Sequence, residues 1–251
     1  MMNPRIATEL RPAHGAAVLA PERPAAGLLF DMGDVLYDAT LWRRWLLRLL
    51  RHMGLHANYR GLYRVWDVDY LDAVHRGQRD YDEAFGAFLN SLGLSPAQVD
   101  EVRAASQAQK HELESGTRAF PTVAATITRL STAGVALGVL SDSESPAAAL
   151  AEKLACLGLG DRFGVVISSL DLHRTKPDPA CYQAALAAMK LPADRVAFVG
   201  HDADELRGAA AVGMFTVAFN YDPEVMADRF IDRFDELLDF VPDAPRLAAA
   251  G

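Results

Sequence analysis

Short apolar runs recur along the chain and predict buried β-strands. They occupy five places, at 27–30, 135–140, 164–169, 195–200 and 215–219. Each run is rich in Val, Ile or Phe and is bounded by glycine or polar residues. This pattern is typical of short strands that lie inside a protein.

Amphipathic stretches lie between most of these runs and predict helices. Gly134 is placed to end the helix before the second strand, and Ser145 to cap the next helix, with Pro146 as its first residue. Asp178 and Pro179 form a similar start farther along. The alternation of strands and helices predicts an α/β fold, a Rossmann-like parallel sheet with helices on both faces.

One interval, between Thr40 and about Ser115, contains no predicted strand. Its first helix carries an apolar stripe of Leu41, Trp42, Trp45, Leu46, Leu49, Leu50 and Met53, with Arg43, Arg44, Arg48 and Arg51 turned away. Further helical stretches follow at 70–94 and 95–115. We expect an all-helical insert, whose stripe either forms the core of a helix bundle or also lines a ligand pocket.

These patterns predict how the chain is divided. We expect a loose tail over 1–26, a core domain over 27–38 and 116–240, a helical cap domain over 39–115 and a second tail over 241–251. The N-terminal stretch lacks the continuous apolar segment of a signal peptide. No apolar run reaches the roughly 18 residues of a membrane span.

Composition narrows the classes of function. Hydrophobic residues make up 51% of the 251 residues, which predicts a packed interior, and the net charge of −8 argues against binding to nucleic acid. The two cysteines, Cys156 and Cys181, have no metal-type spacing and are expected to be buried, reduced thiols of a cytoplasmic protein. The oligomeric state is not readable from the sequence.

Polar side chains follow four of the predicted strands. They are Asp31, then Ser141 with Asp142, then Lys176, and finally His201, Asp202, Asp204 and Glu205. Because ligands of an open parallel sheet bind at the carboxyl ends of its strands, these groups are expected to converge on one edge. Any one of them alone is more typical of a turn than of a site.

Four stretches carry a resemblance to a known family. "LLFDMGDVLYD", "VALGVLSDS", "RTKPDPACYQAAL" and "VAFVGHDADELRGAAAVGM" occur in this order. In them the chain resembles the haloacid dehalogenase superfamily of hydrolases, in the branch with a helical cap inserted after the first motif. The resemblance implies that Asp31 is the nucleophile and that Ser141 and Lys176, with Asp142 beside them, face the substrate anion.

The chemistry of these residue types agrees with those roles. An aspartate is ionised at neutral pH and can attack a phosphoryl group or a carbon without a base to activate it. Several carboxylates in one pocket repel an anion, and Mg²⁺ with its preference for oxygen ligands would remove that conflict. By the resemblance, the expected ligands are Asp31, the carbonyl of Gly33, Asp202 and Glu205.

Two positions depart from the family pattern. Phosphatases of this superfamily usually carry a second aspartate two residues after the nucleophile, and this chain has Gly33 there. Asp34 either caps the loop or approaches Asp31 to replace that acid. His201 stands where the pattern has the first acid of the last motif, and it is a structural hydrogen-bonder, a ligand for a softer metal or a substitute acid–base group.

Three functional classes follow from these observations. The first is a magnesium-dependent phosphatase of a small phosphorylated metabolite, acting through an aspartyl-phosphate. The second is a 2-haloacid dehalogenase-type hydrolase, because those enzymes also lack the second aspartate and work without metal. The third is a catalytically impaired relative that binds a ligand or regulates a partner. The sequence favours the first class and leaves the identity of the substrate open.

Overall fold

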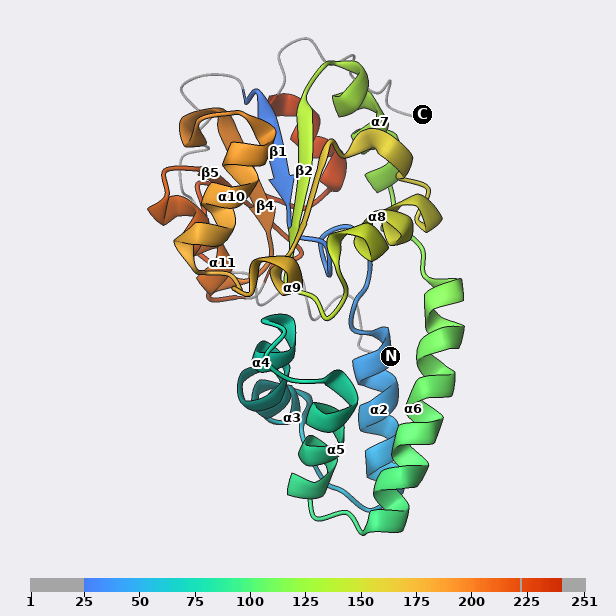
Figure 1. Ribbon diagram of the computed structural model, residues 1–251. Coiled ribbons are helices and arrows are strands. Elements are labelled where there is room, and N and C mark those ends of the chain that lie inside the picture. The colour runs from blue at the N-terminus through green and yellow to red at the C-terminus, as the bar shows by residue number, and fades with distance from the viewer. Residues whose placement is uncertain (1–24, 222, 241–251) are drawn as a thin grey trace.

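The computed structural model describes residues 25–221 and 223–240. The predicted tail over 241–251, and residues 1–24 of the other tail, lie outside the described residues. Figure 1 shows an α/β core with a group of helices standing on one end of its sheet. No helix within the described part of the chain combines the length and the apolar character that crossing a membrane requires.

A parallel sheet of six strands forms the centre of the core. Its strands are β1 (Gly27–Phe30), β2 (Ala136–Ser141), β3 (Val165–Ser168), β4 (Val196–Gly200), β5 (Phe215–Phe219) and β6 (Arg229–Ile231), in the spatial order β3-β2-β1-β4-β5-β6. β1 pairs with both β2 and β4, so all four of its residues are buried. This placement explains why β1 is apolar throughout rather than alternating.

The prediction of a parallel Rossmann-like sheet is confirmed, with one strand added. The added strand, β6, was not predicted; it has three residues and lies at the edge of the sheet. A strand at an edge pairs on one side only and can be short. Its sequence, Arg-Phe-Ile, is too short to show a periodic pattern.

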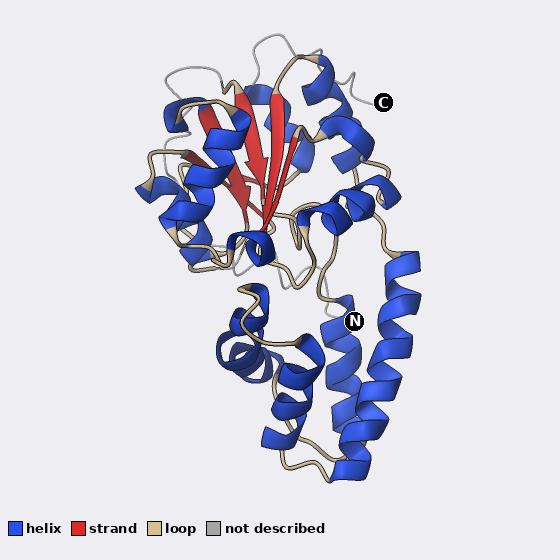
Figure 2. Cartoon of the chain, viewed as in Figure 1, coloured by secondary structure: helices blue, strands red, loops and turns tan. Residues whose placement is uncertain are grey.

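Helices cover both faces of the sheet, as Figure 2 shows. They are α7 (Val123–Thr132), α8 (Ala147–Cys156), α9 (Ser169–Leu172), α10 (Pro179–Met189) and α11 (Ala203–Ala211), with 3₁₀-helical segments η2 (Gly160–Arg162), η3 (Ala193–Arg195) and η4 (Phe234–Phe240). Buried residues of α7, α8 and η4 form one apolar cluster with the sheet, and those of α10 and α11 form a second. Burial on two faces stabilises the sheet that carries the site.

Most of the predicted helix ends are found. Gly134 follows α7 with a positive φ of 80°, and Asp178 caps α10 by accepting a hydrogen bond of 2.9 Å from the Ala180 N–H. The prediction for α8 is wrong by one residue, because Pro146 lies in the cap position and the helix begins at Ala147. The Ser145 carbonyl instead accepts a hydrogen bond from the Ser168 hydroxyl at 2.7 Å, which ties this loop to β3.

The cap is entirely helical over the described residues between 40 and 116. It contains α2 (Leu41–His52), α3 (Tyr59–Val65), a π-helical turn η1 (Trp66–Leu71), α4 (Asp72–His75), α5 (Tyr81–Ser91) and α6 (Pro96–Gly116). Trp66 lies at its centre, with its ring centroid 5.1 Å from that of Phe88 and 5.7 Å from that of Phe85. The cap therefore has its own apolar core, separate from the two clusters on the sheet.

The two cysteines differ in exposure. Cys181 is a buried residue of α10, whereas Cys156 is exposed as the last residue of α8. The expectation of two buried thiols is wrong for Cys156, because the final turn of an amphipathic helix can leave the packed face of the core.

We predict that Gly208→Ala destabilises the protein although it removes a glycine from a helix. An added Cβ would lie 2.8 Å from the Pro177 Cβ and 2.9 Å from the Pro177 carbonyl oxygen, neither of which moves easily. Overpacking of this kind costs about 1–3 kcal/mol. Denaturant unfolding measures the change.

Gly86→Ala in α5 is the matched control. Its Cβ would meet only the Arg103 guanidinium, at 3.8 Å. The usual gain of about 0.5–1 kcal/mol for replacing a helical glycine is therefore expected. An equal gain from both variants would contradict the close packing of α11 against the loop that carries Lys176.

Candidate active site

Asp31 is the first residue after the central strand. Its N–H donates a hydrogen bond of 2.9 Å to the Val199 carbonyl, which continues the pairing of β1 with β4 by one residue. The side chain is buried at the carboxyl edge of the sheet. A buried carboxylate requires partners of opposite charge, and the neighbouring strands supply them.

Lys176 is the main partner of Asp31. Its Nζ lies 2.5 Å from Asp31 Oδ1 and 2.9 Å from Glu205 Oε2, and its side chain has no exposed surface. Burial opposes its charge, but the two carboxylates raise the pKa of Lys176 well above its ordinary value. Lys176 is therefore a permanent cation that joins residues from the loop before α10, the end of β1 and the start of α11.

The pKa of Asp31 is lowered in spite of its burial. Desolvation alone would raise it, and the charges of Lys176 and His201 more than offset that effect. Glu205 responds in the opposite direction, because burial and the nearby Asp31 charge raise its pKa to about 8. The site thus favours ionisation of Asp31 over that of Glu205.

His201 approaches the second oxygen of Asp31. The distance from Nδ1 to Asp31 Oδ2 is 3.4 Å, an ion-pair contact that is long for a hydrogen bond. Burial would lower the pKa of His201, but its contact with Asp31 and the charge of Glu205 raise it to about 9. Both oxygens of Asp31 therefore face nitrogen atoms of cationic side chains.

Ser141 and Asp142 follow β2 on the other side of β1. Ser141 is the last residue of the strand and is buried. Asp142 Oδ1 accepts a hydrogen bond of 3.2 Å from the backbone N–H of Lys176. Burial raises the pKa of Asp142 to about 6, with Lys176 opposing the rise. Asp142 thus orients the segment that carries Lys176, and both residues line the same cavity as Asp31.

Asp34 caps the loop, in agreement with one of the two alternatives left by the sequence. Its Oδ1 accepts a hydrogen bond of 2.9 Å from the Ala39 N–H, and its backbone has a positive φ of 56°. Gly33 lies one residue before it and lines the cavity. A Cβ on Gly33 would lie 3.1 Å from the Ala39 Cβ. The chain therefore folds back close to position 33, where a residue without a side chain fits.

The acids after β4 have separate positions. Asp202 caps α11, because its Oδ1 accepts hydrogen bonds from the N–H groups of Asp204 and Glu205 at 2.8 and 3.1 Å. Asp204 is exposed, pairs with Arg207 at 2.6 Å and is not among the cavity residues. Of the three acids, Asp202 and Glu205 therefore reach the cavity and Asp204 does not.

The expected magnesium ligands meet at one cavity but do not form a metal site. Asp31, Gly33, Asp202 and Glu205 all line it. However, Glu205 is held by Lys176, and His201 lies against Asp31. Among residues 25–221 and 223–240, no group of three or more His, Cys, Asp or Glu side chains is arranged to hold a metal ion. The residues in this arrangement do not fit Mg²⁺.

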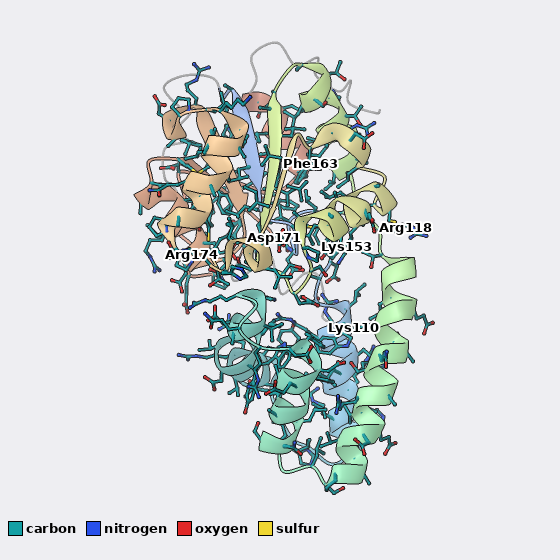
Figure 3. All side chains as sticks on the ribbon, in the orientation of Figure 1. Lys110, Arg118, Lys153, Phe163, Asp171 and Arg174 are labelled. Atoms are coloured by element: carbon teal, nitrogen blue, oxygen red, sulfur yellow. The ribbon has the colours of Figure 1, made fainter. Side chains whose placement is uncertain are left out.

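The cavity lies between the core and the cap and has a volume of about 780 Å³. Cap residues that line it include Trp42, Arg43, Trp66, Asp67, Asp72, His75, Tyr81 and Lys110. Figure 3 labels Lys110 on α6 of the cap and Lys153 on α8 of the core, and both belong to this lining. The apolar stripe of α2 therefore serves both roles left open by the sequence, since Trp42 packs in the cap and faces the cavity.

The prediction that Arg43 turns away from the apolar stripe of α2 is wrong. Arg43 does not turn away with Arg44, but donates a hydrogen bond of 2.8 Å to Asp67 across the cap and lines the cavity. Its guanidinium carbon lies 5.2 Å from the ring centroid of Tyr63. Helical periodicity identifies the buried face of one helix, whereas this contact depends on how two helices pack.

Three contacts between cap and core were also missed. Lys110 Nζ lies 3.4 Å from Glu144 Oε1 and 3.5 Å from the ring centroid of Tyr81. The Thr175 hydroxyl donates a hydrogen bond of 2.9 Å to Asp72 Oδ1, and the Ser169 hydroxyl donates one of the same length to the His75 carbonyl. The cap is thus attached next to Lys176, and no local sequence signal marks these pairs.

Comparison with known proteins gives the family. The sequence pattern of the haloacid dehalogenase-like hydrolases matches residues 26–213. The phosphoglycolate phosphatase of Yersinia pseudotuberculosis is 28% identical over 201 residues, which cover 78% of this chain and 81% of that protein. This similarity spans the core and the cap.

Solved structures share the fold. A 2-haloacid dehalogenase of Pseudomonas syringae aligns with a TM-score of 0.56 and 22% identity, covering 85% of this chain and 96% of that one. A putative hydrolase of Bacillus subtilis, described as bound to magnesium, aligns with a TM-score of 0.63 and 18% identity, covering 87% and 99%. At these identities the alignments establish the architecture alone.

We predict that Lys176→Met strongly destabilises the protein at neutral pH. Removing the cation leaves buried Asp31 unpaired on one oxygen and Glu205 without its partner, at a cost of about 3 kcal/mol. Adding Glu205→Gln should recover little of the loss, because Glu205, whose pKa burial and Asp31 already raise to about 8, becomes neutral once Lys176 is removed. Chemical unfolding measures both variants.

Arg174→Met provides the comparison, because Arg174 pairs with Asp178 at 2.7 Å on the surface. Little change is expected there, since solvent screens exposed pairs. Similar losses from Lys176→Met and Arg174→Met would contradict the importance of the buried pair.

Proposed function

We propose that this chain, which belongs to the haloacid dehalogenase-like hydrolases, removes the phosphoryl group from a small phosphorylated metabolite through an aspartyl-phosphate on Asp31. The observation that carries the proposal is the ionised Asp31, held by Lys176 beside a cavity enclosed by the cap. The similarity to a phosphoglycolate phosphatase supports phosphoryl transfer over other hydrolytic reactions.

The first step transfers the phosphoryl group to the protein. An Asp31 oxygen attacks phosphorus, a new bond forms between that oxygen and phosphorus, and the bond to the leaving oxygen breaks. The leaving oxygen takes a proton from solvent water, which leaves hydroxide, and departs as an alcohol. In the second step water attacks the same phosphorus, the bond to Asp31 breaks, and phosphate is released with Asp31 restored, while the proton that the attacking water loses neutralises that hydroxide.

Lys176 and Ser141 are proposed to bind the phosphoryl oxygens. Lys176 Nζ is already 2.5 Å from the attacking carboxylate, so it can bring nucleophile and phosphate together while reducing their repulsion. Ser141 offers a hydroxyl at the end of β2. Asp142 acts through the Lys176 backbone, which its carboxylate holds in place.

Protonation of the leaving oxygen is the step for which the site provides least. The family's usual acid is missing at Gly33, and Asp34 is engaged with the Ala39 N–H. His201 is a titratable side chain that lines the cavity and lies 3.4 Å from Asp31 Oδ2. Loss of a positioned acid lowers rates by about 10²–10⁴-fold, so slow turnover of substrates with poor leaving groups is expected.

The cap is proposed to select the substrate. Its aromatic and charged residues complete the cavity, and its contacts near Thr175 join it to the segment of Lys176. A small soluble metabolite as substrate and a cytoplasmic location stay predictions for this chain.

Dehalogenation at carbon is the second candidate. It is favoured by the glycine at position 33 together with the absence of a metal cluster among the described residues, since both agree with an attack by Asp31 that needs neither a second aspartate nor a cation. Chloride release from a 2-chloro acid identifies it. If neither chloride is released from 2-chloro acids nor phosphate from phosphate esters, the result would indicate a protein that binds its ligand without turnover.

We predict that Asp31→Asn abolishes hydrolysis of aryl phosphates while leaving the fold intact. The amide cannot act as the nucleophile, and loss of such a group lowers kcat by about 10⁴-fold or more. Phosphate release, measured with and without Mg²⁺, checks the rate, and circular dichroism checks the fold.

Asp204→Asn is the control for that experiment, because it makes the same change at an exposed acid outside the cavity. It should retain the full rate. An active Asp31→Asn protein would refute the assignment of the nucleophile.

We further predict that restoring an acid at position 33 accelerates turnover. Since the new Cβ would crowd Ala39, the variant is Gly33→Asp combined with Ala39→Gly. If protonation of the leaving group limits the rate, kcat for alkyl phosphates should rise by about 10-fold or more. Ala39→Gly alone is the control, and a folded double variant without any gain would show that another step is limiting.

A further inference from the structure

A histidine side chain lies against Asp31, one of the residues that the family resemblance implies as magnesium ligands. His201 directly follows Gly200, the last residue of β4, and its Nδ1 lies 3.4 Å from Asp31 Oδ2. Lys176 Nζ lies 2.5 Å from the other oxygen. Each oxygen of Asp31 thus already faces a nitrogen group of a neighbouring side chain.

The other expected oxygen ligands are also engaged. Glu205 Oε2 is 2.9 Å from Lys176 Nζ, and Asp202 Oδ1 accepts two hydrogen bonds at the start of α11. Turning Asp202 toward a metal through this oxygen would leave N–H groups of α11 without their cap. One oxygen of each of these two acids is therefore already directed at a protein N–H or ammonium group.

Magnesium makes strict demands on its ligands. It prefers six oxygen atoms in an octahedron and gives up its bound water reluctantly. An imidazole is a poor replacement for a carboxylate in that shell. Besides Asp31, the candidate protein ligands are the Gly33 carbonyl and the second oxygens of Asp202 and Glu205, and His201 places an imidazole beside them where the family pattern has a carboxylate.

We propose that His201 replaces the divalent cation in this protein, so that Lys176 and His201 together hold Asp31 and its anionic substrate without metal. The part that concerns the substrate rests on the proposed function, whereas the exclusion of magnesium from the Asp31 site does not. The resulting enzyme is a metal-independent hydrolase that keeps the aspartate nucleophile of its family.

Metal binding tests the proposal without any need for turnover. Mn²⁺ serves as a paramagnetic probe for the magnesium site, and the free ion is measured by electron paramagnetic resonance in titrations of the full chain. The wild-type protein should show no saturable binding at the Asp31 site, and about 10 mM Mg²⁺ should leave its thermal midpoint unchanged. Saturable Mn²⁺ binding that Asp31→Asn abolishes would overturn the proposal.

His201→Asp is the decisive variant, because it supplies the missing carboxylate at the same position. It should bind Mn²⁺ saturably and gain thermal stability with Mg²⁺. His201→Asn is the matched control, since it removes the ring without adding a charge, and it should bind at least tenfold more weakly than His201→Asp. A folded His201→Asp protein that binds no better than wild type would refute the role of His201 in excluding the metal.

Measurement of turnover provides a second, independent test of the proposal. Wild-type turnover of an aryl phosphate should be unchanged after removal of metals with EDTA, and a loss of tenfold or more that Mg²⁺ restores would overturn the proposal. If no phosphate is released under any condition, the proposed function fails, and the binding titrations still decide whether His201 excludes the metal.

Discussion

The ion pair between Lys176 and Asp31 is the interaction on which the site depends. Both side chains are removed from water, so each charge needs the other. Around this pair the chain arranges the ends of three strands and the start of α11, with Glu205 on the Lys176 ammonium and Asp142 on its backbone. The pair keeps Asp31 ionised and brings a cation to the point where a substrate anion would bind. The ion pair between Lys176 and Asp31 therefore both stabilises the buried charges and positions the proposed nucleophile.

The cap adds to this centre through a small number of polar contacts. Asp72 and His75 lie near the end of the cap that meets α9, where they bind Thr175 and Ser169 of the core. Glu144, which follows β2, faces Lys110 of the cap across the cavity. These contacts place cap residues next to the chain segments of Lys176 and Ser141. The position of the cap and the completeness of the site are thus coupled through these contacts, as is common for enzymes that exclude water from their reaction.

The departures from the family pattern form a consistent set. Gly33 removes an acid and His201 replaces an acid with a base, and both residues lie after Asp31 in the sequence, on the segments that follow β1 and β4. In the structure they reduce the negative charge around the nucleophile, which is the task that a divalent cation performs in related sites. Lys176 and His201 now face the two oxygens of Asp31. The chain therefore achieves by side-chain charge what its relatives are expected to achieve with an ion.

The sequence by itself determined the order of the strands and helices of the core, the helical insert and the identity of Asp31, Ser141 and Lys176 as strand-end residues. These features follow from local periodicity and from the rule that parallel strands end at one edge. Only the tertiary structure decided that Arg43 faces the cavity, that Asp202 caps α11, that Asp204 points to solvent and that His201 meets Asp31. Those outcomes depend on how the elements pack and on which of several nearby acids contacts a given hydrogen-bond or ion-pair partner. The contacts of Arg43 with Asp67 and of His201 with Asp31 join residues far apart in the chain, and no local pattern records them, whereas Asp202 and Asp204 find their partners within three residues.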